Sequence, residues 1–207
     1  MKLLSYAQDQ EDIILFEMLK GVEKGFYIDI GANDPDVYSV TKLFYENGWS
    51  GVNVEPLPEL FALLRRERER DINLNVGVGN KIGTMTLHID GMGSTFSEEV
   101  VRDNRLENNP TIEIRVLTLA EILNLVMPSG PIHFCKIDVE GFEKQVLEGM
   151  DWSFRPWIFC MESTKPGTTI PCYEEWEPIL LEHGYILAKT HGINRYYVAE
   201  EHKELIS

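Results

Sequence analysis

The chain has 207 residues, of which 43% are hydrophobic, 10% aromatic and 26% charged, and this composition argues against a disordered chain. Its 19 Lys and Arg residues against 34 Asp and Glu residues give a formal net charge of −15. Proteins that bind nucleic acid or an anionic membrane surface normally carry a basic footprint, so the charge argues against both partner classes. A neutral or cationic ligand is favoured instead.

One domain is expected over residues 1–207, because no linker divides the chain and its length suits a single hydrophobic core. No stretch approaches the roughly 20 apolar residues of a transmembrane span, and the N-terminal apolar patch is too short for a secretory signal. The three cysteines, Cys135, Cys160 and Cys172, are expected to be reduced thiols in a cytoplasmic protein.

In the first half of the chain, hydrophobic periodicity predicts elements of alternating type. Helices are expected at 8–20, 39–47 and 58–70, and buried strands at 26–30, 51–56 and 72–78. The Arg and Glu residues of the third helix are expected to face water. The alternating pattern of residues 84–90 predicts an extra strand attached to the third strand. The polar residues 91–110 predict a loop or lid.

The second half continues the alternation. Strands are expected at 112–116, 132–138 and 156–162, and helices at 120–127, 142–150 and 173–183. Thr118 is a candidate N-cap for the first of these helices. Residues 184–200 predict a final hairpin across His191 and Gly192. This order indicates an α/β domain with a mainly parallel sheet and one antiparallel strand near an edge.

Polar residues and glycines follow the predicted strands. Open α/β sheets bind ligands at the carboxyl ends of their strands, so these residues predict one common site. They are Asp29 to Asp34 after the first strand, Glu55 and Pro56 after the second, Gly77 and Val78 at the third, Asp138 to Gly141 after the fourth, and Glu162 at the fifth.

The first two strand ends carry the most informative residues. Gly31 permits a sharp turn and close approach of a ligand to the backbone, while Asp29 and Asn33 can face an amino-acid-like group. The turn lacks the three glycines of a dinucleotide fingerprint. Glu55 ends the next strand, at the position where an acid typically accepts both hydroxyls of an adenosine ribose.

A set of motifs between Ser5 and Glu162 resembles one known family. They are SYAQDQED, FYIDIGAND, KLFYENGWSGVNVEP, NVGVGNKIGTMTL, STF, VLTLAEIL and KIDVEGFEKQVLEGM, in that order. With them the chain resembles the FkbM-type methyltransferases, which use S-adenosylmethionine. The resemblance implies a Rossmann-like class I fold, a three-layer sandwich around a seven-stranded sheet. It also implies O-methylation of a hydroxyl on a sugar, a glycan or a similar polyhydroxyl acceptor, as in polysaccharide biosynthesis.

The same resemblance implies a role for each strand end. Asp29 to Asn33 would line the methionine end of the cofactor, Glu55 would hold the ribose, and Gly77 and Val78 would lie by the adenine. Residues 1–25, with Gln8, Asp9 and Asp12, would form a helical cap, although an ordinary amphipathic helix explains them nearly as well. The expected cofactor-binding residues are Gln8, Asp29, Gly31, Ala32, Asn33, Glu55, Pro56, Gly77, Val78 and Asp138.

Methyl transfer to an alcohol requires that the hydroxyl be held near the methyl group and lose its proton. Asp138 is the first candidate for the reacting centre, with Glu140 and Glu162 beside it. The three carboxylates are expected either to bind one divalent cation through oxygen or to supply one base and two orienting groups. A role of Glu140 at the N-terminus of the following helix is an alternative.

Four further residues are candidates for contact with the acceptor. Ser94 and Thr95 lie in the predicted substrate loop at 91–111, Lys136 shares a strand face with Asp138, and His191 lies in the final hairpin.

Two other functions compete with a methyltransferase. A nucleotide-sugar glycosyltransferase would use Asp138-Val139-Glu140 as a metal motif, but only Lys136 and Lys144 are nearby to face a diphosphate. A non-catalytic relative that keeps the cofactor pocket is the second alternative, and the intact set of carboxylates argues against it.

Overall fold

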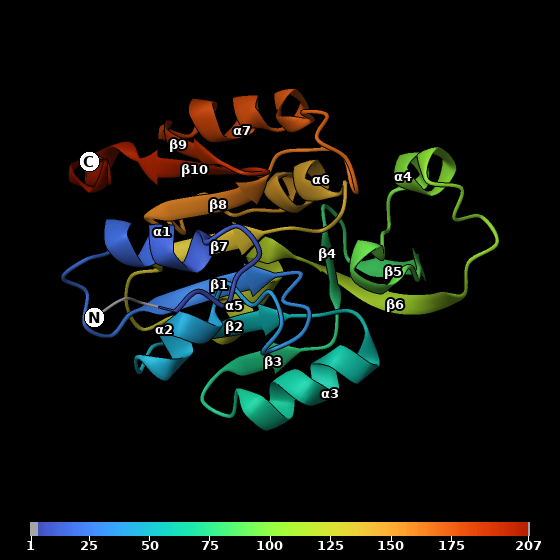
Figure 1. Cartoon of the computed structure of the whole chain (residues 1–207), viewed down its shortest axis with the longest axis horizontal. Helices are drawn as coiled ribbons and strands as arrows, with labels where there is room; N and C mark the ends of the chain where they lie inside the picture. The colour runs from blue at the N-terminus through green and yellow to red at the C-terminus, as the bar shows by residue number, and fades with distance from the viewer. Residues whose placement is uncertain (1–3, 207) are drawn as a thin grey trace.

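The computed structural model describes residues 4–206, which form a seven-stranded sheet and a smaller three-stranded sheet (Figure 1). The strand order of the large sheet is β3-β2-β1-β7-β8-β10-β9. β10 runs antiparallel to both of its neighbours, β8 and β9, and all other neighbouring strands of this sheet are parallel. The predicted fold is therefore confirmed. The strands are β1 (Phe26–Ile30), β2 (Ser50–Val54), β3 (Ile72–Leu74), β7 (Phe134–Ile137), β8 (Ile158–Glu162), β9 (Tyr185–His191) and β10 (Asn194–Ala199).

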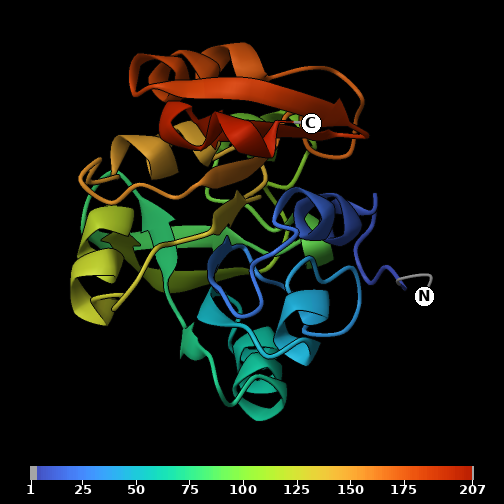
Figure 2. The same ribbon diagram turned by 90° about the vertical axis from the view of Figure 1, so that its left-hand side faces the viewer.

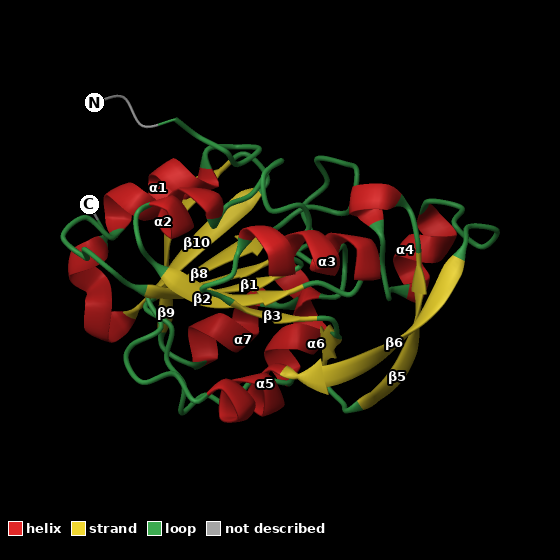
Figure 3. Cartoon of the chain, turned by 90° about the horizontal axis from the view of Figure 1, so that it is seen from below, coloured by secondary structure: helices red, strands yellow, loops and turns green. Residues whose placement is uncertain are grey.

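Helices cover both faces of this sheet and make three layers (Figure 3). The helices on one face are α1 (Glu11–Met18), α2 (Lys42–Glu46) and α3 (Pro58–Glu67), and those on the other are α5 (Leu119–Val126), α6 (Glu143–Glu148) and α7 (Glu177–Glu182). The hairpin β9–β10 and strand β3 form the two edges of the sheet (Figure 2). No helix among residues 4–206 has the length and apolar character needed to cross a membrane.

The central strands are apolar because both of their faces are covered. On the side of α1 and α2, the core contains Leu15, Phe44 and Phe134, and the ring centroids of the two phenylalanines lie 4.6 Å apart. On the other side, Ile122 and Val146 pack against the sheet. The predicted N-cap Thr118 accepts a hydrogen bond from the Glu121 N–H, as expected.

The predicted strand at 72–78 is wrong as a single element. β3 ends at Leu74, and the chain then enters the second sheet as β4 (Gly77–Gly79). The side chain of Asn75 ends β3, because its amide donates to the carbonyls of Glu55 and Pro56 and ties the chain to the end of β2. In the second sheet, β6 (Thr111–Thr118) lies between β4 and β5 (Gly83–His88). The predicted extra strand at 84–90 therefore pairs with β6 and not with the strand before it.

The segment predicted as a loop or lid has ordered structure of its own. It contains a 3-10 turn at Gly91–Gly93 and the helix α4 (Glu98–Asp103), whose N-cap Ser97 accepts from the Val100 N–H. Thr95 is fully buried between them. The segment packs through Phe96 against β6, so its polar sequence marks exposed faces rather than an unstructured loop.

Most of the predicted helices are shorter than the sequence indicates, whereas α5 has its predicted length. The helix predicted at 8–20 begins only at Glu11, and that at 39–47 begins at Lys42. In the Arg and Glu run after α3, the prediction that all side chains face water is wrong for Arg68. Its side chain is 3% exposed and its guanidinium donates to the Pro35 carbonyl and the Ser39 hydroxyl. Two further 3-10 helices lie at Tyr173–Glu175 and Glu200–Leu205.

Candidate functional site

A cavity of about 440 Å³ opens at the carboxyl ends of β1, β2, β7 and β8. Most of the residues predicted for the site line it. They are Gln8, Gly31, Ala32, Asn33, Glu55, Pro56, Gly77, Val78, Ser94, Lys136, Asp138, Glu140 and Glu162. Three predicted residues, Asp29, Thr95 and His191, are not among the lining residues. One sheet edge thus brings together groups that are far apart in the sequence.

Gly31 lies where the chain after β1 closely approaches the backbone after β7. Its φ angle of 76° is unfavourable for other residues, and a Cβ atom there would collide with the Asp138 carbonyl oxygen. The Gly31 and Ala32 N–H groups both donate to the Val54 carbonyl, at 3.0 and 3.1 Å. The turn after β1 is therefore held against the ends of β2 and β7, and its backbone lines the cavity.

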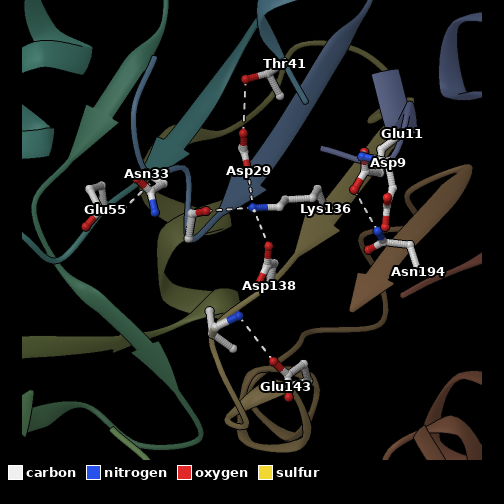
Figure 4. A network of polar contacts seen from close by, with 12 residues as sticks. Asp9, Glu11, Asp29, Asn33, Thr41, Glu55, Lys136, Asp138, Glu143 and Asn194 are labelled. Carbon is white, nitrogen blue, oxygen red and sulfur yellow. Dashed lines mark hydrogen bonds and ion pairs between the residues drawn. The ribbon is translucent and has the colours of Figure 1, made fainter. Parts of the chain in front are cut away.

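Glu55 is fixed in place by the backbone around it (Figure 4). Its Oε2 accepts from the Asn33 N–H at 2.9 Å and its Oε1 from the Leu57 N–H at 2.8 Å. Asn33 has a left-handed φ of 54°, which directs its N–H toward the carboxylate. Burial raises the pKa of Glu55, and the two backbone bonds oppose this rise. Each oxygen keeps a further lone pair, so the carboxylate can accept two additional hydrogen bonds.

Lys136 lies at the cavity wall and contacts three oxygen atoms (Figure 4). Its Nζ donates to the Gly31 carbonyl at 2.7 Å and lies 3.4 Å from both Asp29 Oδ1 and Asp138 Oδ2. Burial lowers the pKa of Lys136, but the two carboxylates outweigh this effect and the net pKa is raised. Its ammonium therefore has one hydrogen-bond acceptor and two carboxylate ion-pair partners.

Asp29 lies beneath the cavity instead of lining it. It is 1% exposed, and its Oδ2 accepts from the Thr41 hydroxyl at 3.0 Å. Burial raises the pKa of Asp29, while Lys136 and Thr41 oppose this rise. Asp29 therefore does not face the cavity, although the sequence led us to expect that it would. Its carboxylate instead contacts the ammonium of Lys136.

Asp138, Glu140 and Glu162 bring one carboxylate oxygen each within 4.8 Å of the others. Glu162 is 6% exposed, and its Oε2 has no hydrogen-bond partner among the described residues. Burial, followed by the neighbouring carboxylates, raises the pKa of Glu162 to about 11 and that of Glu140 to about 8. Without a bound cation, Glu140 and Glu162 therefore favour their protonated forms at neutral pH, and a cation among the three carboxylates would displace those protons.

Glu143 holds the loop that carries two of these carboxylates, and it was not singled out from the sequence. Its Oε1 accepts from the Val139 and Gly141 N–H groups, both at 3.2 Å. Burial raises the pKa of Glu143 to about 7, against the opposing effect of these bonds. Thr95 supports the same loop, because its hydroxyl donates to the Glu140 carbonyl at 2.7 Å. The left-handed φ of 55° at Glu140 is thus stabilised from both sides.

The N-terminal segment contributes Glu11, a second residue that the sequence did not reveal. Glu11 Oε1 accepts from the Asn194 amide at 2.7 Å, and Oε2 accepts from the Asp9 N–H at 2.7 Å (Figure 4). Both Glu11 and Asn194 line the cavity and are buried. Asp12 binds the Tyr6 N–H and the Ser5 hydroxyl, so its role is to fold the segment. Gln8 is exposed at the rim.

The structure does not bring His191 to the cavity. Its side chain is exposed at the end of β9, while Ile193 and Asn194 from the same hairpin line the cavity. Ser94 does line it, but its hydroxyl donates to the Gly91 carbonyl and accepts from the Asp90 N–H.

Gly77 has a structural explanation that the sequence did not reveal. A Cβ atom there would lie 2.7 Å from Cζ of Phe96, so packing of this ring already requires a glycine. Gly77 and Val78 nevertheless both line the cavity.

Residues 29–187 match the family model described as the methyltransferase FkbM domain. Among solved structures, methyltransferase FkbM from Methylobacillus flagellatus KT aligns with 85% of this chain at a TM-score of 0.55 and 14% identity. The alignment covers 44% of that protein, so the chain spans less than half its length. Precorrin-6y C5,15-methyltransferase from Geobacter metallireducens GS-15 aligns with 96% of this chain and 91% of its own, at a TM-score of 0.44 and 12% identity. A comparison with curated proteins gave no match.

Proposed function

Because the chain belongs to the family of FkbM methyltransferases, we propose that it transfers a methyl group from S-adenosylmethionine to a hydroxyl of a sugar, a glycan or a similar polyhydroxyl acceptor. The observation that carries the cofactor assignment is Glu55. Its buried carboxylate lines the cavity and keeps one acceptor position on each oxygen, which suits the two hydroxyls of a ribose.

The other cofactor contacts follow from the lining of the cavity. The methionine end of the cofactor would contact Gly31, Ala32 and Asn33. The adenine would contact Pro56, Gly77 and Val78, and Gln8 would contact the cofactor from the rim. When bound, the cofactor supplies an electrophilic methyl group on a positively charged sulfur. The acidic lining suits that positive charge, since Lys136 is the only Lys or Arg among the described lining residues.

The carboxylate cluster is the proposed reacting centre. Asp138 is the first candidate to take up the proton of the acceptor hydroxyl, because its side chain is 38% exposed while Lys136 fixes its Oδ2. Glu140 and Glu162 would orient the hydroxyl. Ser94 and its neighbours in residues 90–93, which line the same cavity, are the proposed contacts of the acceptor.

The reduced thiols support a cytoplasmic location. Cys135 and Cys160 are buried as free cysteines in the core, where each remains without a disulfide partner.

Isothermal titration with S-adenosylhomocysteine and with UDP-glucose tests the proposal. We expect S-adenosylhomocysteine to bind at micromolar strength and UDP-glucose not to bind, because Lys136 is already engaged and the lining is otherwise acidic. Binding of UDP-glucose alone would instead support a glycosyltransferase. A screen of labelled S-adenosylmethionine against glycan precursors, read by mass spectrometry, then identifies the acceptor, and a cofactor that binds without any turnover would indicate a non-catalytic relative.

A further inference from the structure

We infer that Asp138, Glu140 and Glu162 together bind one divalent cation through carboxylate oxygens, and that this cation coordinates two neighbouring hydroxyls of the acceptor. The second half of this inference rests on the proposed function, whereas the cation site itself does not.

The geometry of the three carboxylates fits a single hard cation. One oxygen from each lies within 4.8 Å of the other two. Magnesium and calcium bind oxygen ligands at about 2.0–2.6 Å, so two ligands of one ion lie at most about 5 Å apart. The cluster therefore needs only small side-chain adjustments to share an ion.

Glu162 gives an independent indication of a ligand. It is 6% exposed, its Oε2 is inaccessible and has no hydrogen-bond partner among residues 4–206, and the residue lines the cavity. A buried carboxylate oxygen without a partner is costly unless a bound group completes it. A cation shared with Asp138 and Glu140 supplies the missing partner.

The charges around the cluster are not balanced by the protein. Lys136 is the only Lys or Arg among the described lining residues, and it also serves Asp29 and the Gly31 carbonyl. It contacts Asp138 at 3.4 Å. Glu140 and Glu162 therefore have no positively charged partner among the described residues, and the two charges of a divalent ion would balance their two carboxylates.

The loop that presents the ligands is already held in shape. Glu143 accepts from the N–H groups of Val139 and Gly141, and Thr95 donates to the Glu140 carbonyl. Such support around the ligands lowers the cost of organising a metal site. Three carboxylate ligands leave about three of six positions open, and two adjacent hydroxyls of a polyol fit two of them.

Titration of the full chain with Mn²⁺, followed by electron paramagnetic resonance of the free ion, tests the site. We expect one saturable site at about neutral pH and a loss of affinity of at least tenfold in Glu162→Gln and in Glu140→Gln. Glu59→Gln removes the same charge from an exposed position in α3 and is the matched control, which should bind as the wild type does.

Absence of a saturable site, or equal weakening in Glu59→Gln and Glu162→Gln, would overturn the inference. Thermal unfolding of each variant and its titration with S-adenosylhomocysteine show that fold and cofactor site are intact. A chain that binds Mn²⁺ in this way but no S-adenosylhomocysteine would contradict the proposed function and leave the cation site standing.

Discussion

Glu55 combines two tasks in one side chain, since it fixes two backbone N–H groups and lines the cavity. Replacing it by alanine should weaken S-adenosylhomocysteine binding by about 1–3 kcal/mol, which is roughly 5- to 150-fold in Kd, because hydrogen bonds to a charged acceptor are lost. Isothermal titration measures the change, and Glu59→Ala in the exposed turn of α3 is the control. An unchanged Kd in Glu55→Ala would contradict the assignment of this residue to the ribose.

On the adjacent strands β1 and β7, Asp29 and Lys136 form a buried charged pair. Lys136→Met should lower the free energy of unfolding by about 3–5 kcal/mol, because Asp29 is left as a buried charge without its partner. The double variant Asp29→Asn with Lys136→Met should recover much of this loss. Urea denaturation gives all four values of the cycle, and strictly additive effects would show that the two residues do not act together.

In the turn between β7 and α6, the buried Glu143 carboxyl accepts from two backbone N–H groups. Burial raises its pKa to about 7, above the ordinary 4.5 of a glutamate, so the folded chain binds this proton more tightly than the unfolded chain does. The resulting stability is fully present below pH 4.5 and is lost as the pH rises through 7. Glu143→Gln should therefore gain stability relative to the wild type between pH 5 and 8, on the order of 2–3 kcal/mol.

Urea denaturation in EDTA across this pH range measures that difference. Glu148→Gln removes one exposed charge from the same helix and serves as the control. A difference between Glu143→Gln and wild type that stays constant with pH would show that Glu143 does not change its charge in this window.

Elements were predictable from the sequence where one segment carries its own pattern. Strand β1, the hairpin β9–β10 and the capped helix α5 follow from periodicity and turn residues alone. The break after Leu74 was not predictable in this way, because Gly77 to Gly79 continue an apolar run and only the contacts of Asn75 reveal the change of sheet.

The same limit applies to the candidate site. Carboxylates at strand ends were found because the sheet topology dictates where they lie. Glu11 and Asn194 were missed because their contact joins residues 183 positions apart, and the family motifs end before the hairpin. Thr95 was recognised as part of a motif, but its burial beneath Glu140 depends on tertiary packing.

On the scale of the whole molecule, the N-terminal segment meets the β9–β10 hairpin beside the cavity. Asp9 Oδ2 accepts from the Ile193 N–H at 3.4 Å, and a Cβ atom at Gly192 would collide with the Asp9 side chain. Gly192→Ala should release the N-terminal segment and increase its rate of cleavage by a nonspecific protease at least severalfold. Gly91→Ala is the matched control, because its φ of 59° resembles the 56° of Gly192 and no atom lies within 4 Å. Equal cleavage of both variants would show that backbone strain, and not this contact, is responsible.

The meeting of Glu11 with Asn194 also has a consequence for synthesis on the ribosome. One wall of the cavity needs the first helix and the last strand at once, so a nascent chain that has exposed only β1 to β8 lacks part of the pocket. A small molecule that fits the pocket should then stabilise chains that have formed β10 more than shorter chains that lack it. A higher ligand concentration in the cell would therefore protect chains that contain β10 against degradation more than chains truncated before it.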